Sequence, residues 1–360
     1  MSIRILHIVT YMGRGGLETM LMNYYRAIDR TKIQFDFLTH RDFRADYDDE
    51  IEALGGKIYR LPNLNPFSRN YLDALDRFFE EHPEYRIVHS HLDCMSAIPL
   101  KAAKKHGVPV RIAHSHSSRQ DRDLKYPLKL LFKRGIAGQA TQLFACGQEA
   151  GKWMFGTDDF HVLNNAIDAK RYCFDPEVRQ EVRCELSIPE NALVAGHVGR
   201  FMAPKNHGLL MRIFAELPDD TRLLLVGDGE LRAENERLAE ELGIRDRVVF
   251  AGLRSDVDRM LQAMDVFVFP SLYEGLPLSV IEAQAASLPC LISDKVPLEC
   301  KKTDLVTQIP LDASPAEWAE AVLSVAETPR RDTLAQIREA GFDIRANAEW
   351  LQNHYLSFEV

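Results

Sequence analysis

The sequence lacks the long apolar run that a membrane-spanning helix requires. Its 360 residues are 46% hydrophobic and 27% charged, an ordinary globular composition. No stretch reaches the roughly 18 to 20 apolar residues that cross a bilayer. The N-terminal run Ile3–Val9 is short, contains Arg4 and His7, and shows no small-residue cleavage site after it. We therefore expect a buried first strand there and no signal peptide, and the length indicates about two domains.

The sequence also lacks cysteine motifs. No Cys-x-x-Cys occurs, and no Cys/His spacing is typical of a zinc site. We expect reduced thiols in a cytoplasmic protein. The six scattered cysteines are Cys94, Cys146, Cys173, Cys184, Cys290 and Cys300.

Acidic residues outnumber basic ones overall, and one segment is locally basic. The net charge is -9, but residues 1–170 carry 24 Lys and Arg against 21 Asp and Glu, while residues 171–360 carry 20 against 32. Residues 101–134 hold ten basic and two acidic side chains. An acidic protein with one basic patch is not expected to bind nucleic acid. The patch suits an anionic membrane surface or a phosphorylated acceptor, so a peripheral position on the inner face of the membrane is one interpretation. The alternative is a surface helix over 122–135 whose apolar face packs on the first domain.

Apolar β-branched runs alternate with amphipathic segments along most of the sequence. This alternation predicts parallel sheets covered by helices. The predicted strands of the first half are 3–9, 35–38, 57–60, 87–90, 110–114, 143–146 and 161–163, and those of the second half are 193–198, 222–226, 248–251, 266–270, 289–293 and 306–309. The main predicted helices are 17–27, 71–82, 207–216, 231–241 and 315–327.

This pattern runs twice, which predicts two doubly wound, Rossmann-like α/β domains. We place the first at 1–170 and the second at 171–342, with a last helix at about 343–360 that packs back on the first domain. The polar stretch 168–190, broken by Pro176 and Pro189, is expected to be the linker. Ligands are expected in a cleft at the carboxyl ends of the strands, where the two domains face each other.

The sharpest motif follows the strand 266–270. In the segment Ser271–Ala283, Gly275 permits a tight turn and Pro277 suits the first turn of a helix. The amides of Leu276 and Leu278 are then expected at a helix N-terminus, which attracts anions. Glu282 is expected to accept hydrogen bonds from a diol such as ribose, and Glu274 to orient a sugar. The alternative is one capping and one solvated glutamate.

The pair Glu274 and Glu282 resembles the Glu-x7-Glu motif of retaining glycosyltransferases of family 4, and the resemblance covers nearly the whole chain. It is nearest to members that build exopolysaccharides and capsules. The resemblance implies the GT-B fold, an acceptor-binding first domain and a second domain that binds the nucleotide-sugar, with a UDP-sugar as the expected donor. It also implies transfer with retention and no essential metal or other cofactor.

Two cations follow the first strand of the second domain. Arg200 and Lys205 can neutralise a diphosphate and stabilise the charge on the departing nucleotide, as the equivalent residues do in the family. Alone, they would read as solvated surface cations. In resembling enzymes the turn at Gly227 lies near the nucleotide, and the backbone at Leu253 and Arg254 meets the base. The alternative for the first is a plain turn in which Asp228 acts as a cap.

A glycine-rich turn follows the first strand. Gly15 and Gly16 open a helix, and the resemblance places them beside the donor phosphates and the acceptor. The turn is not Gly-x-Gly-x-x-Gly, so a dinucleotide fingerprint is absent and NAD-dependent oxidoreduction is disfavoured. A plain strand-to-helix turn is the alternative.

Two histidines end the strand 110–114. His114 and His116 point the same way if the strand continues, and the resemblance places one of them against the transferring sugar. We prefer His116, which is nearer the loop, although spacing does not decide between them. No third metal ligand is evident, so no metal site is predicted.

A turn at the end of the first domain departs from the family pattern. Ala166 stands where the family has glycine, so the turn geometry there is open. We read the whole as a hexosyltransferase that acts on a saccharide or lipid-linked acceptor. The alternatives are a UDP-sugar 2-epimerase of the same fold and an inactive sugar-nucleotide-binding subunit.

Overall fold

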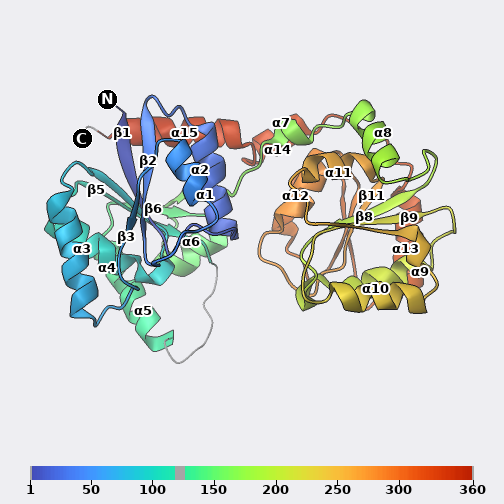
Figure 1. Ribbon diagram of the computed structural model, residues 1–360, viewed down its shortest axis with the longest axis horizontal. Coiled ribbons are helices and arrows are strands. Elements are labelled where there is room, and N and C mark those ends of the chain that lie inside the picture. The colour runs from blue at the N-terminus through green and yellow to red at the C-terminus, as the bar shows by residue number, and fades with distance from the viewer. Residues whose placement is uncertain (1, 118–125, 359–360) are drawn as a thin grey trace. The chain divides into compact units, whose positions relative to one another are not determined.

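The computed structural model describes residues 2–117 and 126–358, and the chain forms two compact units (Figure 1). The first unit is Met1–Ile167 with Ile344–Val360, and the second is Asp168–Asp343. Each unit holds one parallel sheet with helices on both faces, so the predicted fold class is confirmed. No helix within the described residues is both long enough and apolar enough to cross a membrane.

The first unit is built on a seven-stranded sheet in the order β3-β2-β1-β4-β5-β6-β7. All its neighbouring strands run parallel. Near-continuous apolar strands of this kind are buried on both faces. The strands are β1 (Ile3–Ile8), β2 (Ile33–Thr39), β3 (Ile58–Arg60), β4 (Ile87–Ser90), β5 (Val110–Ser115), β6 (Gln142–Ala145) and β7 (His161–Val162).

Side chains alternate between the two faces of this sheet. Ile5 and Phe35 pack with α1 (Gly16–Ala27), α2 (Asp48–Ala53) and α15 (Ile344–Leu356). Leu6 and Val88 pack on the opposite face with α3 (Arg69–Glu81), α4 (Ala97–Lys105) and α6 (Gln148–Phe155), and Phe132 of α5 (Tyr126–Gly135) joins them. The short 3-10 helices Asp93–Ser96 and Ile136–Gly138 complete the unit.

The last helix, α15, belongs to the first unit. The N–H of Ile344 donates to the carbonyl of Ile167 at 2.8 Å, and Asn347 Nδ2 donates to the Tyr24 hydroxyl at 3.3 Å. Leu351 and Tyr355 are buried in the same core as α1. The chain therefore returns to the first unit after completing the second.

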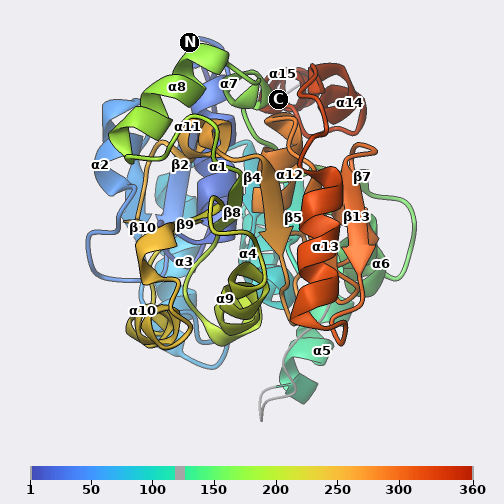
Figure 2. The ribbon, with the colours of Figure 1, turned by 90° about the vertical axis from the view of Figure 1, so that its right-hand side faces the viewer.

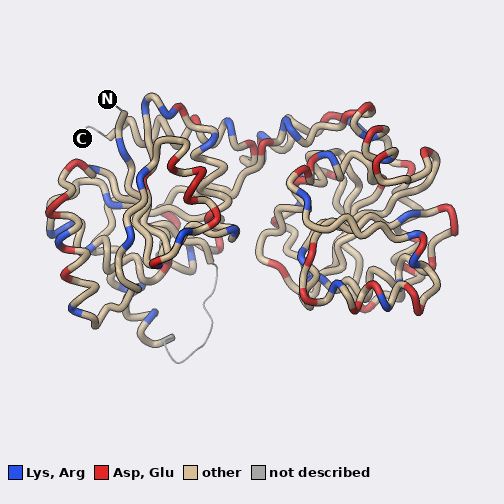
Figure 3. The backbone as a smooth tube through the Cα atoms, viewed as in Figure 1, with Lys and Arg blue, Asp and Glu red and all other residues tan. Residues whose placement is uncertain are grey.

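The second unit has a six-stranded parallel sheet in the order β10-β9-β8-β11-β12-β13. One face packs against α8, α11 and α12, and the other against α9, α10 and α13; α9 and α13 lie side by side (Figure 2). α10 carries two arginines among four glutamates, so both charge signs lie along this helix (Figure 3). The strands are β8 (Val194–Val198), β9 (Arg222–Val226), β10 (Val248–Gly252), β11 (Val266–Phe269), β12 (Cys290–Ser293) and β13 (Val306–Ile309). The helices are α7 (Ala169–Tyr172), α8 (Pro176–Glu185), α9 (His207–Ala215), α10 (Arg232–Glu241), α11 (Val257–Ala263), α12 (Leu278–Ala285), α13 (Pro315–Val325) and α14 (Leu334–Glu339), with 3-10 turns at Ala203–Lys205, Arg245–Arg247 and Leu298–Cys300.

The expected linker at 168–190 is wrong. These residues form α7 and α8 and belong to the second unit, where α8 packs against α11. Pro176 begins α8, because its missing N–H is not needed in a first turn, and the Asp175 carboxylate accepts from the N–H groups of Glu177 and Val178. Pro176 therefore starts a helix and does not interrupt one.

The turn at Ala166 carries no strain. Ala166 is fully buried and is absent from the residues with positive φ among those described. Alanine therefore fits the backbone conformation at this position, and the doubt raised by the missing glycine is removed.

Candidate active site

Both sheets reverse their strand order once. The reversal falls between β1 and β4 in the first unit and between β8 and β11 in the second. Loops that leave the carboxyl ends of such neighbouring strands diverge to opposite faces, which opens a ligand-binding crevice at that point. Gly15 and Gly16 follow β1, Arg200 and Lys205 follow β8, and Glu274 to Glu282 follow β11. The other predicted site residues follow neighbouring strands of the same two edges, namely His116 after β5, Gly227 after β9, and Leu253 and Arg254 after β10.

Lys205 and Glu274 form an ion pair at the reversal point of the second sheet. Lys205 lies in the loop after β8 and Glu274 in the loop after β11, and Lys205 Nζ donates to Glu274 Oε1 at 2.7 Å. Both side chains are mostly buried, with exposures of 17% and 14%. The Lys205 ammonium also lies 4.7 Å from the centroid of the Phe269 ring, a cation–π contact. Lys205 and Glu274, which the sequence analysis predicted separately, thus form one ion pair.

Backbone contacts hold these two loops together. The N–H of Leu272 donates to the carbonyl of Pro204 at 2.8 Å, and Asn206 Nδ2 donates to the carbonyl of Pro270 at 3.1 Å. Asn206 has φ +55°, a left-handed conformation that asparagine tolerates better than most residues. The Lys205 side chain is therefore positioned by a loop whose geometry is fixed.

Arg200 lies apart from the Lys205–Glu274 pair. Its side chain is 70% exposed and approaches Glu230 Oε2 at 3.4 Å, its one ion-pair partner among the described residues. An exposed pair at this distance contributes little to stability. The guanidinium is therefore available to an anionic ligand at low cost.

Gly227 packs the loops of this edge against one another. It has φ +141°, and a side chain there would collide with the carbonyl of Gly199. Its N–H donates to the carbonyl of Gly252 at 2.8 Å, and the N–H of Gly199 donates to the carbonyl of Val226 at 3.0 Å. Glycine at 227 lets the loop that carries Arg200 cross β9 closely.

Glu282 is bound by a tyrosine at the start of the second unit. Tyr172 of α7 donates its hydroxyl proton to Glu282 Oε1 at 3.0 Å. Burial raises the pKa of Glu282, and the Tyr172 bond partly opposes that rise. Oε1 is thus engaged by Tyr172, the side-chain hydrogen bond that Glu282 makes among the described residues.

The glycine–proline turn differs from the prediction in one residue. Pro277 is the N-cap of α12 and has φ -75° and ψ 103°, so the helix begins at Leu278 and not at the proline. Gly275 is exposed, and nothing lies within 4 Å of the position that a Cβ would take there. The amide of Leu278 is at the first position of the helix, while Leu276 precedes the cap.

The loop after β10 places Leu253 in solvent, with 81% exposure. Arg254 is engaged by two carboxylates: it donates to Asp256 at 2.8 and 2.7 Å and to Glu185 at 3.0 Å. The Arg254 side chain is therefore a structural clamp, which leaves the backbone of this loop as its free hydrogen-bonding surface.

The carboxyl edge of the first sheet carries glycines and histidines. Gly15 is the N-cap of α1, and Gly16 begins that helix directly after the β1 loop. Asn165 Nδ2 donates to the Gly16 carbonyl at 3.5 Å. His116 follows β5 and is partly exposed, whereas His114 is 1% exposed. The rings of His114 and His116 stack with centroids 4.1 Å apart.

Three further histidines join these two, and the sequence analysis missed them. Period-two alternation places His7 of β1 and His89 of β4, with His91 directly after it, on the same sheet face as His114 and His116. His7 Nδ1 lies 3.0 Å from His91 Nε2, and His91 Nδ1 lies 2.9 Å from His116 Nε2. His89 Nε2 lies 3.1 Å from His114 Nδ1, and His89 Nδ1 lies 2.6 Å from the Tyr355 hydroxyl. The signal was present as His-Ser-His both at 89–91 and at 114–116.

Burial keeps these rings uncharged. It lowers the pKa of His7 and of His116 to about 3, and it lowers the pKa of His89, His91 and His114 well below the ordinary value. Beside them, burial raises the pKa of Asp93 to about 6. Asp93 Oδ1 accepts from the backbone N–H of His116 at 2.8 Å and so holds the end of β5.

The fold brings a third imidazole close to His114 and His116, which the sequence alone did not show. Ring nitrogens of His91, His114 and His116 lie within 4.8 Å of one another, as do those of His7, His89 and His91. Imidazole nitrogens at this spacing are of the type that holds zinc. His91 is therefore a third imidazole beside His114 and His116, which sequence spacing did not show, and the absence of a metal site stays a prediction.

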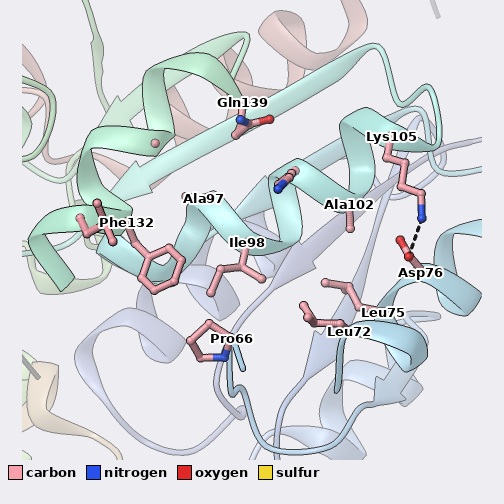
Figure 4. Close-up of a pocket in the computed structure, with 13 residues that line it drawn as sticks. Pro66, Leu72, Leu75, Asp76, Ala97, Ile98, Ala102, Lys105, Phe132 and Gln139 are labelled. Carbon is pink, nitrogen blue, oxygen red and sulfur yellow. Dashed lines mark hydrogen bonds and ion pairs between the residues drawn. The ribbon is translucent and has the colours of Figure 1, made fainter. Parts of the chain in front are cut away.

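A cavity of about 640 Å³ lies on the first unit, on the face that carries α3, α4 and α5 (Figure 4). Its lining is mainly apolar, with Leu72, Ile98 and Phe132 pointing into it, and Lys101 and Lys105 also line it. Lys105 is paired with Asp76 at 2.6 Å. Leu131 of α5, which also lines the cavity, is 63% exposed.

Two protein-family models match the chain. The model described as "Glycosyl transferases group 1" matches residues 178–343, and the "Glycosyl transferase 4-like domain" matches residues 15–155. The first match includes every predicted site residue of the second unit, and the second includes Gly15, Gly16 and His116.

Individual relatives agree with these matches. The chain is 38% identical to "Putative glycosyltransferase EpsF" of Bacillus subtilis strain 168 over 98% of this chain and 96% of that one. It is 29% identical to the "UDP-Gal:alpha-D-GlcNAc-diphosphoundecaprenol alpha-1,3-galactosyltransferase" of Escherichia coli over 59% of this chain and 58% of that one. The crystal structure of Anabaena Alr3699/HepE in complex with UDP is similar in fold, with a TM-score of 0.81, 17% identity and coverage of 99% and 100%.

Proposed function

The chain belongs to the group 1 glycosyltransferases, and from that membership we propose that it transfers a sugar from a UDP-sugar to a saccharide or lipid-linked saccharide during polysaccharide biosynthesis, with retention of anomeric configuration. The observation that carries the proposal is the Lys205–Glu274 pair at the reversal point of the second sheet. The Lys205 ammonium can pair with a diphosphate, and the Glu274 carboxylate can accept hydrogen bonds from a sugar. UDP as donor nucleotide is supported by the printed names of the galactosyltransferase and of the HepE complex.

Lys205 and Arg200 bind the diphosphate in this proposal. Arg200 is exposed and engages phosphate oxygens in a bidentate manner, while Lys205 is preset by its loop. As the bond between the anomeric carbon and the phosphate oxygen breaks, both cations stabilise the charge on the departing diphosphate. The acceptor oxygen bonds to the anomeric carbon, and its proton leaves with the diphosphate. These cations take the role of a metal ion, so no cofactor is proposed.

Glu274 and Glu282 bind hydroxyl groups. When phosphate oxygens approach Lys205, Glu274 turns to hydroxyls of the transferred sugar, for which a carboxylate is a strong acceptor. Glu282 Oε2 accepts from the ribose diol while Tyr172 retains Oε1. The backbone amide of Leu278, the exposed Gly275 loop and the backbone around Leu253 complete the nucleotide contacts.

The first unit binds the acceptor in this proposal. At the same edge, Gly15 and Gly16 offer backbone at the start of α1 to the donor phosphates and the acceptor, and His116 offers a ring nitrogen to hydroxyls of the transferred sugar. The described parts of the basic segment 101–134, residues 101–117 and 126–134, face an anionic membrane on the inner side of the cell in this proposal, and residues 118–125 of the segment lie outside the described residues. Lys101 and the exposed Leu131, both at the cavity on this unit, support that contact.

Calorimetric titration with UDP, GDP, ADP and NAD, without added metal, tests the donor assignment. We expect selective binding of UDP that Glu282→Ala weakens. Screening of UDP-sugars with lipid-linked acceptors then identifies the transferred sugar, and the anomeric configuration of the product tests retention. Formation of an epimer without acceptor would instead establish a 2-epimerase. No binding of any nucleoside diphosphate would favour an inactive subunit.

Flotation with vesicles tests the membrane contact separately. Vesicles with 30% phosphatidylglycerol are expected to bind the protein, and pure phosphatidylcholine vesicles are not. A lysine near an anionic surface contributes about 1 kcal/mol, so Lys101→Glu is expected to weaken binding by at least about 5-fold. Lys295→Glu, an exposed lysine of the second unit paired with Asp294, is the matched control. Equal binding to both vesicle types would remove the membrane from the proposal.

A further inference from the structure

The five histidines at the carboxyl edge of the first sheet form two separate hydrogen-bonded chains. One runs from His7 through His91 to His116, with N–N distances of 3.0 and 2.9 Å. The other runs from Tyr355 through His89 to His114. The first chain ends at a partly exposed ring and the second at a buried one. The first chain is therefore the one that can act on a ligand.

Proton counting limits the first chain to two arrangements. A neutral imidazole carries one N–H and one lone pair, and each N–N contact needs one of each. In one arrangement the proton lies on Nδ1 of His7, His91 and His116. In the other it lies on Nε2 of all three. The nitrogen that carries the proton in His7 therefore determines which nitrogen carries it in His116, because the two nitrogens of His91 link these rings.

The surroundings of His7, at the buried end of the chain, favour one of these two proton arrangements. His7 Nε2 is buried and has no hydrogen-bond partner among the described residues, and the His7 ring packs against the rings of Phe35 and Phe37 as well as those of two neighbouring histidines. Burial of an unpaired N–H is costly. Among backbone groups, orphaned buried N–H groups are rarer than under-satisfied carbonyls, and we apply the same order to ring nitrogens. The arrangement with a lone pair on His7 Nε2 and a proton on Nδ1 is therefore favoured.

This result defines what His116 offers. We propose that His7 and His91 are positioning residues that hold His116 with its proton on Nδ1, so that this nitrogen donates a hydrogen bond to an oxygen of the ligand. His116 Nδ1 makes no hydrogen bond within the described residues, while Nε2 is occupied by His91. That the oxygen belongs to a sugar rests on the proposed function; the proton position does not.

A bound metal would exclude this arrangement. Zinc held by His91, His114 and His116 would take the lone pairs through which the chain is linked. The N–N distances of 2.9 to 3.1 Å within the two chains are hydrogen-bond distances, and each central ring uses both nitrogens in them. The contacts thus favour neutral, linked rings over a metal centre.

The direct experiment is a two-bond ¹H–¹⁵N correlation spectrum of the full chain labelled with ¹⁵N-histidine at pH 7.5, with His116→Asn to assign the His116 signals. We expect the Nδ1–H form for His116, in contrast to the Nε2–H form that free histidine prefers. His91→Phe keeps a ring in place and removes both links, so His116 is expected to revert to the Nε2–H form. His91→Asn retains a donor close to the former Nδ1 and is expected to restore the Nδ1–H form.

Kinetics provide a second measurement. His91→Phe is expected to lower kcat about 10-fold, and His91→Asn to stay within about 3-fold of wild type. His89→Phe, in the second chain, is the matched control and is expected to leave the His116 tautomer unchanged. If His91→Phe does not fold, the wild-type spectrum and that of His7→Phe decide the matter.

Three outcomes would overturn the proposal. These are an Nε2–H form of His116 in the wild-type protein, an unchanged His116 tautomer in folded His91→Phe, and one equivalent of zinc that remains after dialysis without chelator. The spectrum needs no substrate. A protein with the Nδ1–H form that transfers no sugar would therefore refute the proposed function and leave this inference intact.

Discussion

The two sheets reverse their strand order in the same way, yet their carboxyl edges carry opposite chemistry. The edge of the first unit holds neutral rings linked to one another, as in the His7–His91–His116 chain, in which His7 and His91 are buried and His116 is partly exposed. The edge of the second unit holds charged groups, including the exposed Arg200 and the Lys205–Glu274 pair. Uncharged hydrogen-bonding groups suit a polyhydroxyl ligand, and cations suit a diphosphate. The comparison teaches that the strand topology provides the place, and the residues at the strand ends decide the ligand.

The largest effect on this contrast between the two edges is expected when the mostly buried cation of the second unit, Lys205, is removed. In the proposed function, Lys205→Ala takes away a group that stabilises the departing diphosphate, and it leaves Glu274 without its ion-pair partner. We expect kcat to fall by at least about 100-fold, the scale of losing one preorganised charge-stabilising donor. Steady-state kinetics with the identified UDP-sugar measure this. Lys301→Ala, an exposed lysine on the same unit, is the control, and near-normal turnover of Lys205→Ala would remove the assigned role.

Arg200 tests whether an exposed cation contributes as much as a buried one. Arg200→Ala is also expected to reduce turnover by about 100-fold, because its bidentate contacts strengthen as charge develops on the diphosphate. Its stability is expected to stay within about 0.5 kcal/mol of wild type, since the Glu230 pair is exposed. Arg212→Ala, on the outer surface of α9, serves as the comparison. Unchanged turnover would assign Arg200 to the surface.

Glu282 and Tyr172 sharpen the assignment of the ribose contact. A hydrogen bond to a charged group contributes about 1.5 to 3 kcal/mol, so Glu282→Ala is expected to weaken UDP binding by about 10- to 100-fold. Tyr172→Phe removes one donor and leaves the carboxylate in place, so a smaller loss of up to about 10-fold is expected. Calorimetric titration compares the two. An equal loss in both variants would mean that Tyr172 positions the glutamate and that Glu282 does not bind UDP by itself.

The smallest expected effect concerns stability and separates the units by pH. The folded-state pKa of His7 is lowered to about 3 from 6.5, so the unfolded chain binds more protons between these values. Stability is therefore complete above about pH 6.5 and falls as the pH decreases below it, by up to about 1.4 kcal/mol per pH unit for each such histidine. In the described first unit burial lowers the pKa of seven histidines, whereas in the described second unit it lowers the pKa of only His197 and His207.

Urea unfolding at pH 7.5, 6.5 and 5.5 measures that effect. His7→Phe keeps the ring contacts with Phe35 and removes one titrating group, so its unfolding free energy is expected to decrease less steeply with falling pH than that of wild type. Parallel pH dependences of the two proteins would show that His7 is not held neutral by the fold.

Local patterns determined most of the fold. Apolar β-branched runs place every predicted strand within two residues of an observed one, because a buried parallel strand must be apolar on both faces. The stretch 168–190 is the instructive failure. Its polarity and prolines resemble a linker, but Asp175 and Pro176 are a helix start, and the apolar side of α8 packs on α11. Composition alone did not separate a capped helix from a loop.

The sequence by itself determined the elements, the family and the identity of the predicted site residues. Only the tertiary structure decided which of them meet: Lys205 and Glu274 are 69 positions apart, and His7 and His91 are 84 apart. Side-chain period and cap chemistry act over a few residues, whereas these contacts follow from strand order, which right-handed crossovers set over the whole unit. That is why the sequence analysis did not connect His7 and His91 with His116, whereas the fold brings the three rings together.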